Sequence, residues 1–122
     1  MISLTLAALF TAQPLACDNP VTQQDMNQCA AREANEADAD LNLIYPQVVA
    51  HFEQLDRDSE TQEGVRRLRA AQRAWVAFRA AECALTGYEA LGGTLEPLLV
   101  SGCQAELTKS RAAELRQMLT NR

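Results

Sequence analysis

Four cysteines, Cys17, Cys29, Cys83 and Cys103, are the residues of this sequence whose spacing is most informative about chemistry. An even number of cysteines in a small exported domain is typical of disulfide pairing. We expect the pairs Cys17–Cys29 and Cys83–Cys103, because each bond closes a short local segment, whereas the crossed pairings require distant parts of the chain to meet. Zinc binding is the alternative, but no C-x-x-C spacing and no pair of histidines accompanies these cysteines. Oxidised cysteines leave no thiol nucleophile for catalysis.

The other residues that could bind a metal or catalyse a reaction do not form a recognisable site. The run from Glu36 to Asn42 alternates oxygen ligands as a calcium loop does, but it lacks the glycine at which such a loop turns. His51 is the only histidine and has no obvious serine or cysteine partner. Sixteen acidic residues offer many carboxylate pairs, and none stands out as the pair of a glycosidase would. We therefore predict a protein that is not an enzyme and that holds no metal and no cofactor.

The N-terminal segment has the composition of an export signal. Residues 1–16 contain no charged side chain, and an apolar run over residues 4–10 precedes a small-residue ending before Cys17. The run is shorter than the roughly 20 residues that a transmembrane helix requires. We predict a signal peptide over residues 1–16, a single mature domain over residues 17–122, a periplasmic or secreted location and no transmembrane segment. A lipid anchor on Cys17 is the second choice, because Pro14 stands where such sites usually have leucine.

Beyond the leader, apolar residues recur at steps of three and four, which is the spacing of helices and not of strands. The first predicted helix begins at Thr22, whose hydroxyl can cap it, and its apolar stripe runs to Leu55. Pro46 interrupts this stripe. Because proline removes a backbone donor and clashes with the preceding turn, we expect a kink or a break near residues 42–45. The polar residues 56–59 then end the segment.

Two further helices complete the predicted fold. One is expected from near Ser59 to just before Gly87, and the other from about Cys103 to Met118. The stretch between them, residues 87–102, contains two adjacent glycines and a proline, and we expect a long irregular loop there. The sequence thus predicts an all-α fold, a small antiparallel bundle of about three main helices that is stapled by disulfides.

Several polar residues lie on the otherwise apolar stripes of the first two predicted helices. Arg79 is on the core-facing side of the second helix, and a buried guanidinium group needs a carboxylate or several carbonyl groups as partners. We predict that Arg79 reaches Asp38 or a neighbouring acid on the first helix. Because buried polar clusters most often specify packing, we interpret this one as structural. The predicted network consists of Asp38, Asn42, Tyr45, Gln72, Trp75 and Arg79.

The charges are unevenly distributed along the chain. Residues 17–60 carry ten acidic and two basic side chains, a charge of −8, and residues 61–122 carry six acidic and nine basic ones, a charge of +3. The net charge of −5 disfavours nucleic-acid binding, because a phosphate backbone would be repelled. The opposite charges could help the first two helices to pack side by side. Alternatively, the acidic segment steers a cationic partner protein toward the surface.

Five segments distributed over residues 17–119 combine into a recognisable pattern. They are Cys17-x11-Cys29, Ala37-Asp38-x-x-Leu41-Asn42-x-x-Tyr45, Leu68-x-x-Ala71-Gln72-Arg73-Ala74-Trp75-Val76-x-Phe78-Arg79-x-x-Glu82-Cys83, Gly92-Gly93-Thr94 and Cys103-x4-Thr108-x-x-Arg111-x3-Leu115. This pattern resembles the lysozyme-inhibitor LprI-like N-terminal domain family of exported bacterial proteins. The resemblance implies a small exported helical domain with paired cysteines, and it implies no catalytic residues.

Two functions from different classes are compatible with these observations. The first is a periplasmic inhibitor that binds a cationic lysozyme or similar muramidase through acidic side chains and the loop over residues 87–102. The second is a structural or accessory protein that binds another component of the cell envelope and does not affect lysozyme. A projecting acidic loop able to enter a sugar-binding cleft favours the first. The candidate partner-binding residues in the loop are Glu89, Gly92, Gly93, Thr94 and Glu96.

Overall fold

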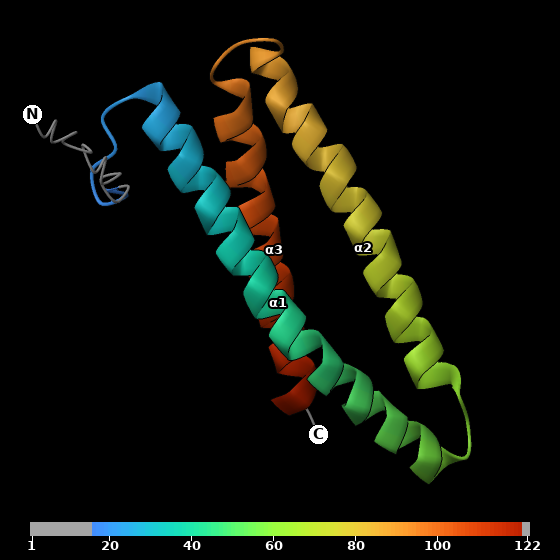
Figure 1. The fold of residues 1–122 in the computed structure, drawn as a ribbon. Coiled ribbons are helices and arrows are strands. Elements are labelled where there is room, and N and C mark those ends of the chain that lie inside the picture. Colours follow the sequence, from blue (N-terminus) through green and yellow to red (C-terminus); the bar gives the residue numbers. More distant parts are fainter. Residues whose placement is uncertain (1–15, 121–122) are drawn as a thin grey trace, which may run out of the picture.

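A computed structural model describes residues 16–120, which form three long α-helices and contain no β-strand (Figure 1). α1 spans Gln23–Ser59, α2 spans Glu63–Gly87 and α3 spans Glu96–Thr120, and the short 3-10 helix η1 spans Tyr88–Ala90. Consecutive helices run antiparallel, so α1 and α3 point in the same direction. The predicted all-α bundle is confirmed. Nearly all of the predicted signal peptide lies outside the described residues, and within them no helix is long and apolar enough to cross a membrane.

The hydrophobic core lies mainly between α1 and α3. Leu41, Ile44 and Val48 of α1 are buried against Leu115 of α3, and Leu68 of α2 joins this cluster. The three residues of α1 are spaced by three and four positions, so they share one face of the helix. α2 contributes little else to the apolar core, because its buried residues are Leu68, Cys83 and Gly87.

α1 begins as predicted and continues without a break through Pro46. The Thr22 hydroxyl oxygen accepts a hydrogen bond from the Asp25 backbone N–H at 3.0 Å, which caps the first turn. Pro46 removes one intrahelical hydrogen bond, and the axis of α1 changes direction along its length in Figure 1. The helix bends and does not break, because Ile44 and Val48, on either side of the proline, are both buried in the core.

The second and third helices differ from the predicted boundaries. α2 begins at Glu63 and not near Ser59, which is the last residue of α1. The predicted long loop over residues 87–102 is wrong in extent, because α3 begins at Glu96. Pro97 lies in the first turn of α3, where the missing N–H has no intrahelical acceptor to lose. Only η1 and residues 91–95 connect the two helices. The glycines and the proline therefore predicted a longer irregular segment than the structure has.

Asp56, a buried acid near the end of α1, fixes the start of α2. Its two carboxylate oxygens accept hydrogen bonds from the backbone N–H groups of Gly64 and Val65, at 2.9 and 3.0 Å. N–H groups in the first turn of a helix have no intrahelical partner, and a side chain must satisfy them when they are buried. Gln62, the residue at the N-cap position, makes no such bond. Asp56 therefore caps α2 from a different helix, which the sequence analysis did not anticipate.

The approach of this carboxylate requires a glycine at position 64. A Cβ atom on Gly64 would lie 2.6 Å from the Asp56 Oδ1 atom, which is closer than real Cβ contacts allow. The chain reverses just before, where Glu60 adopts a left-handed conformation with a φ of 55° and ends α1. The Thr61 backbone N–H also donates to the Asp56 carbonyl oxygen at 2.9 Å. Asp56 thus accepts hydrogen bonds from three backbone N–H groups of the turn between α1 and α2 and of the start of α2.

Replacing Asp56 tests the role of this cap. We expect Asp56→Ala to lower the free energy of unfolding by about 1–2 kcal/mol, because two N–H groups at the start of α2 lose their acceptor. Urea unfolding followed by circular dichroism measures the change. Asp58→Ala is the matched control, because Asp58 is an exposed acid on the same helix and should change stability little. Equal midpoints for the two variants would show that the cap does not stabilise the turn.

Candidate functional site

Both predicted disulfides, Cys17–Cys29 and Cys83–Cys103, are present. The first ties the segment that precedes α1 to that helix, and the second joins the end of α2 to α3. Because all four cysteines are bonded, no thiol is available as a nucleophile. The cysteines therefore hold the ends of the bundle in place, and they brace the turn between α2 and α3.

Arg79 connects all three helices. Its Nη1 atom donates to Asp38 Oδ1 of α1 at 2.6 Å and to the Thr108 hydroxyl of α3 at 2.9 Å. Its guanidinium group lies over the Trp75 ring, 4.8 Å from the ring centre. Thr108 is fully buried, whereas the Asp38 side chain is 46% exposed. The predicted contact between Arg79 and Asp38 is present, but the acid is only partly removed from water.

A second arginine, Arg111 of α3, extends this polar cluster. Its Nε atom donates to Gln72 Oε1 of α2 at 3.0 Å, and its Nη1 atom donates to Glu114 at 3.0 Å. Arg111 is buried, with 9% of its surface exposed. The sequence places Arg111 on the same side of the third predicted helix as Leu107 and Leu115, but no partner was predicted for it. The reasoning used for Arg79, that an arginine on an apolar stripe needs a polar partner, applies equally to Arg111 and would have predicted a buried contact for it.

Two residues of the predicted network, Asn42 and Tyr45, make no hydrogen bond to its other members within residues 16–120. Asn42 is exposed on α1, and within residues 16–120 no hydrogen bond joins its side chain to Arg79 or Gln72. It directly follows the buried Leu41, and one residue of an α-helix rotates the side chain by about 100° away from the core. Tyr45 is half-buried and packs against the apolar core. Asn42 therefore lies outside the hydrogen-bonded cluster, whereas Tyr45 lines a surface hollow together with Gln72.

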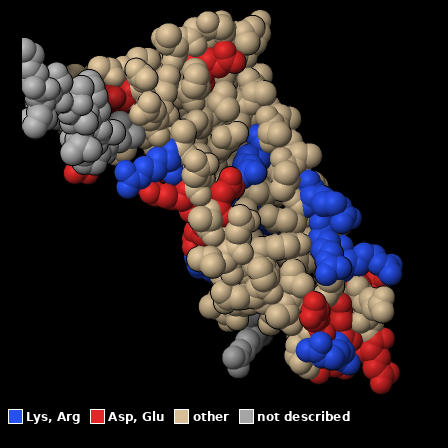
Figure 2. All heavy atoms as spheres, viewed as in Figure 1, with Lys and Arg blue, Asp and Glu red and all other residues tan. Residues whose placement is uncertain are grey.

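Three acidic residues of α1 are paired with basic residues of the other helices. Glu33 forms an ion pair with Lys109 of α3, and Asp40 forms one with Arg116 of the same helix. Figure 2 shows acidic and basic atoms side by side on the face it presents. These contacts fit the view that opposite charges assist packing, with α3 as the main partner of α1. Three of the ten acidic residues in the segment 17–60 are thus held by basic residues of α2 and α3.

The turn that follows α2, residues 88–95, forms an exposed end of the bundle, at the top of Figure 1. Tyr88, Leu91 and Leu95 are 67%, 69% and 42% exposed, and they surround an open hollow together with Glu89. Large apolar side chains gathered in one exposed segment typically mark a binding surface. The sequence analysis considered only the acidic and small residues of this segment, although its apolar residues were visible in a stretch expected to be a loop.

Three contacts hold this turn in place. The Gly92 backbone N–H donates to Glu96 Oε2 at 2.7 Å, and Gly92 has a φ of 78°, which favours glycine. The Asn27 side chain of α1 donates to the Thr94 carbonyl oxygen at 2.8 Å. The Cys83–Cys103 bond joins α2 and α3, the two helices on either side of the turn. Glu96 is consequently the first residue of α3 and a support of the turn, not a free acid of a loop as expected.

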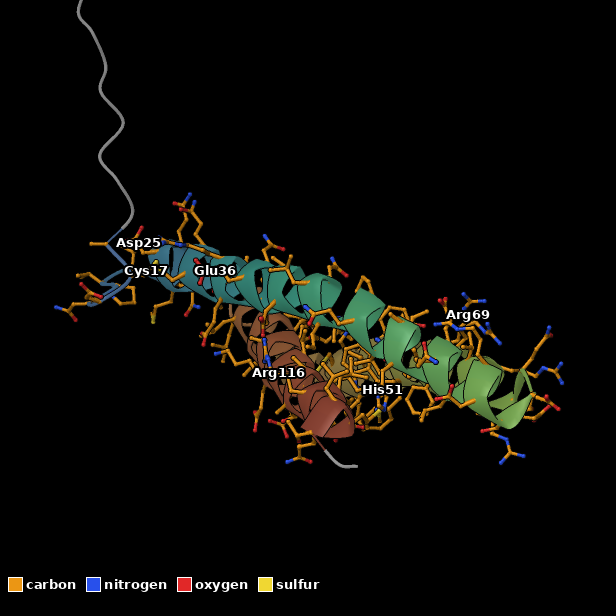
Figure 3. All side chains as sticks on the ribbon, turned by 90° about the horizontal axis from the view of Figure 1, so that it is seen from below. Cys17, Asp25, Glu36, His51, Arg69 and Arg116 are labelled. Carbon is orange, nitrogen blue, oxygen red and sulfur yellow. A yellow bond between two sulfur atoms is a disulfide. The ribbon has the colours of Figure 1, made fainter. Side chains whose placement is uncertain are left out.

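Titratable residues are spread along the helices of the described part of the chain. Figure 3 shows Asp25, Glu36, His51 and Arg69 at separate places along α1 and α2. The His51 ring lies half-buried and edge-on to the Phe52 ring, with 5.5 Å between their centres. Within the described part of the chain, no group of three or more His, Cys, Asp or Glu side chains could hold a metal ion. The arrangement offers surfaces for binding, and the turn over residues 88–95 is one that exposes several large apolar side chains.

Comparison with known proteins gives a family match over nearly the whole described chain. The family described as "Lysozyme inhibitor LprI" matches residues 17–115. The chain is also 44% identical over 108 residues to an uncharacterized protein of Rhizobium meliloti (strain 1021), a region that covers 84% of this chain and 78% of that relative. No solved structure matches the chain significantly.

The contacts of Arg79 predict a loss of stability when this side chain is removed. Arg79→Ala should lower the free energy of unfolding by about 1–3 kcal/mol, because the buried Thr108 hydroxyl loses its partner and Trp75 loses the guanidinium group. This is less than the cost of breaking a fully buried pair, since Asp38 remains in contact with water. Urea unfolding provides the measurement, and Arg73→Ala, an exposed arginine on the same helix, is the control. An Arg79 variant as stable as the control would contradict the structural role.

Proposed function

This chain belongs to the LprI lysozyme inhibitor family, and from that premise we propose that it inhibits lysozyme-type muramidases by direct binding, in the periplasm or outside the cell. The family is described as one of lysozyme inhibitors. Two disulfides are typical of proteins in an oxidising compartment outside the cytoplasm. The single observation that carries the proposal is the exposed apolar turn over residues 88–95.

The chemistry of this turn suits a protein partner. Tyr88 supplies an aromatic side chain with a polar tip, a type enriched among residues that dominate binding energy. Leu91 and Leu95 add exposed apolar surface whose removal from water would favour association. The contacts through Asn27, Glu96 and the nearby disulfide hold the backbone in advance, so little conformational entropy is lost on binding. A held, protruding turn is a shape that fits the concave cleft of an enzyme.

Electrostatics would assist the encounter with a cationic enzyme. The chain carries a net charge of −5, which attracts a basic protein at long range and raises the association rate. Glu89 is an exposed acid within the turn itself, so it would be near the partner in the complex. The paired acids of α1 contribute to the long-range field but are already engaged with Lys109 and Arg116. We therefore assign the contact to the turn and not to the first helix.

The contact is tested by replacing one exposed leucine of the turn. Leu91→Ala should raise the inhibition constant about tenfold without changing the thermal midpoint, because the side chain is 69% exposed in the free protein. Leu43→Ala is a matched control, since Leu43 is 71% exposed but lies on α1 outside the turn. The measurement is turnover of a cell-wall substrate by a cationic lysozyme at increasing inhibitor concentration.

Two outcomes would contradict the proposal. Inhibition that is lost equally in both leucine variants, or in neither, would place the contact away from the turn. No inhibition by micromolar protein at low salt would remove the inhibitory function. The accessory role, in which the chain binds another envelope component without affecting lysozyme, would then be the remaining hypothesis.

The electrostatic contribution gives a separate prediction about rates. Association with a cationic lysozyme should slow as salt shortens the Debye length from about 30 Å to about 8 Å, and dissociation should change less. Glu89→Gln should lower the association rate at low salt more than Asp58→Asn does, because both remove one exposed acid but only Glu89 lies in the turn. Surface plasmon resonance at two salt concentrations measures both rates. Equal effects of the two substitutions would show that only the net charge matters.

A further inference from the structure

The outer surface of α2 is apolar and exposed, and neither the helix packing nor the turn over residues 88–95 explains it. Phe78 is 52% exposed and Leu85 is 65% exposed, and the alanines around them are exposed as well. These residues recur at steps of three and four, so they share one side of the helix. The outer α2 face consists of Ala70, Ala74, Ala77, Phe78, Ala81, Ala84 and Leu85.

Beyond Arg73, which borders the face near its N-terminal end, no charged side chain interrupts it. Between Arg73 and Glu89 the sequence has only two charged residues, Arg79 and Glu82. Arg79 points inward to Asp38 and Thr108, and Glu82 is half-buried. From Ala74 to Leu85 the uncharged part of the face is about 17 Å long at 1.5 Å per residue. In Figure 2 the upper part of the molecule, where α2 ends, shows few charged atoms. An uncharged apolar strip of this length on one helix is typical of a contact with a partner.

The charges at the two ends of the face distinguish between possible partners. Arg66, Arg67, Arg69 and Arg73 lie at its N-terminal end, and Glu89 follows its C-terminal end. Arg66 and Arg67 share one exposed carboxylate, that of Glu63, so positive charge remains in excess at the N-terminal end. A second copy in antiparallel orientation would bring the arginines of each chain near Glu89 of the other. A parallel second copy would place arginines against arginines, which is unfavourable. The charge pattern is therefore complementary to itself under a two-fold rotation, as an isologous interface requires.

We propose that the outer α2 face is the interface of a homodimer in which two α2 helices pack antiparallel. A two-fold axis between Ala77 and Phe78 pairs Ala74 with Ala81 of the second copy, and Ala70 with Leu85. The same register brings Arg66 to Glu89 of the second copy. Alanines allow the two helix axes to approach closely, and Phe78 and Leu85 fill the space on either side. The apolar centre and the charged ends are thus satisfied by one arrangement.

The expected dimer is a weak one. A contact made by one helix pair is small, below the roughly 1,200 Å² that stable interfaces bury in total. The protein should therefore be monomeric at low micromolar concentration and increasingly dimeric above it. Sedimentation equilibrium over this range measures the association. Ala81→Glu should abolish it without shifting the thermal midpoint, because Ala81 is exposed in the monomer and central in the dimer. Leu43→Glu, an equally drastic change at an exposed site of α1, should leave association intact.

Disulfide trapping tests the orientation and the register. The native cysteines are all paired, so one added cysteine is the only free thiol. Ala77→Cys lies beside the proposed axis and should form a covalent dimer rapidly under mild oxidation. Ala70→Cys is on the same face, but in an antiparallel pair the two copies of residue 70 are about 22 Å apart. A disulfide requires Cα atoms within about 7 Å, so this control should remain monomeric.

The possible results separate clearly. Rapid trapping at position 77 and not at position 70, together with concentration-dependent association, supports the proposal. Trapping at position 70 would indicate a parallel pair and overturn it. A monomer at all concentrations would overturn it too, and pelleting of that monomer with phospholipid vesicles would assign the face to a lipid surface instead. Muramidase inhibition is not a readout here, so the dimer can fail or succeed independently of the proposed function.

Discussion

The structure depends on how α2 is attached to the other two helices. α1 and α3 share a continuous apolar core, whereas α2 buries few apolar side chains and is held at three points along its length. Asp56 caps its first turn, Arg79 bridges its middle to α1 and α3, and the Cys83–Cys103 bond fixes its end. Each of these interactions is directional, so together they set the position and the rotation of α2 where apolar packing alone would leave both poorly specified.

This mode of attachment leaves two surfaces free. Because α2 is anchored by polar groups on its inner side, its outer side retains Phe78, Leu85 and a series of alanines in contact with water. Because the disulfide and Glu96 hold the turn that follows, Tyr88, Leu91 and Leu95 are presented at the end of the bundle and are not buried. Exposed apolar groups on a rigid scaffold are able to bind a partner at low entropic cost.

Several charged side chains of α1 form ion pairs with the other helices and so contribute to the fold. Glu33, Asp38 and Asp40 of α1 all contact basic residues on other helices, and such partly exposed pairs each contribute modestly to stability. Together these pairs favour the observed alignment of α1 with α2 and α3, because opposite charges meet in it. What remains for a partner at long range is the net charge of −5, which influences how fast a cationic protein arrives more than how tightly it is held.

The sequence by itself determined the features that local physics controls. Apolar spacing predicted three helices, the Thr22 hydroxyl marked the start of α1, the even cysteine count and short separations predicted both disulfides, and an arginine on an apolar stripe predicted the contact with Asp38. Only the tertiary structure showed that Asp56 caps another helix, that Glu96 supports the turn and that Asn42 faces water. These facts depend on how helices are placed relative to one another. Hydrogen bonds between residues of different helices leave no periodic pattern in a single sequence. The position of Pro97 is compatible with either a loop or the first turn of a helix, so the sequence did not fix where α3 begins.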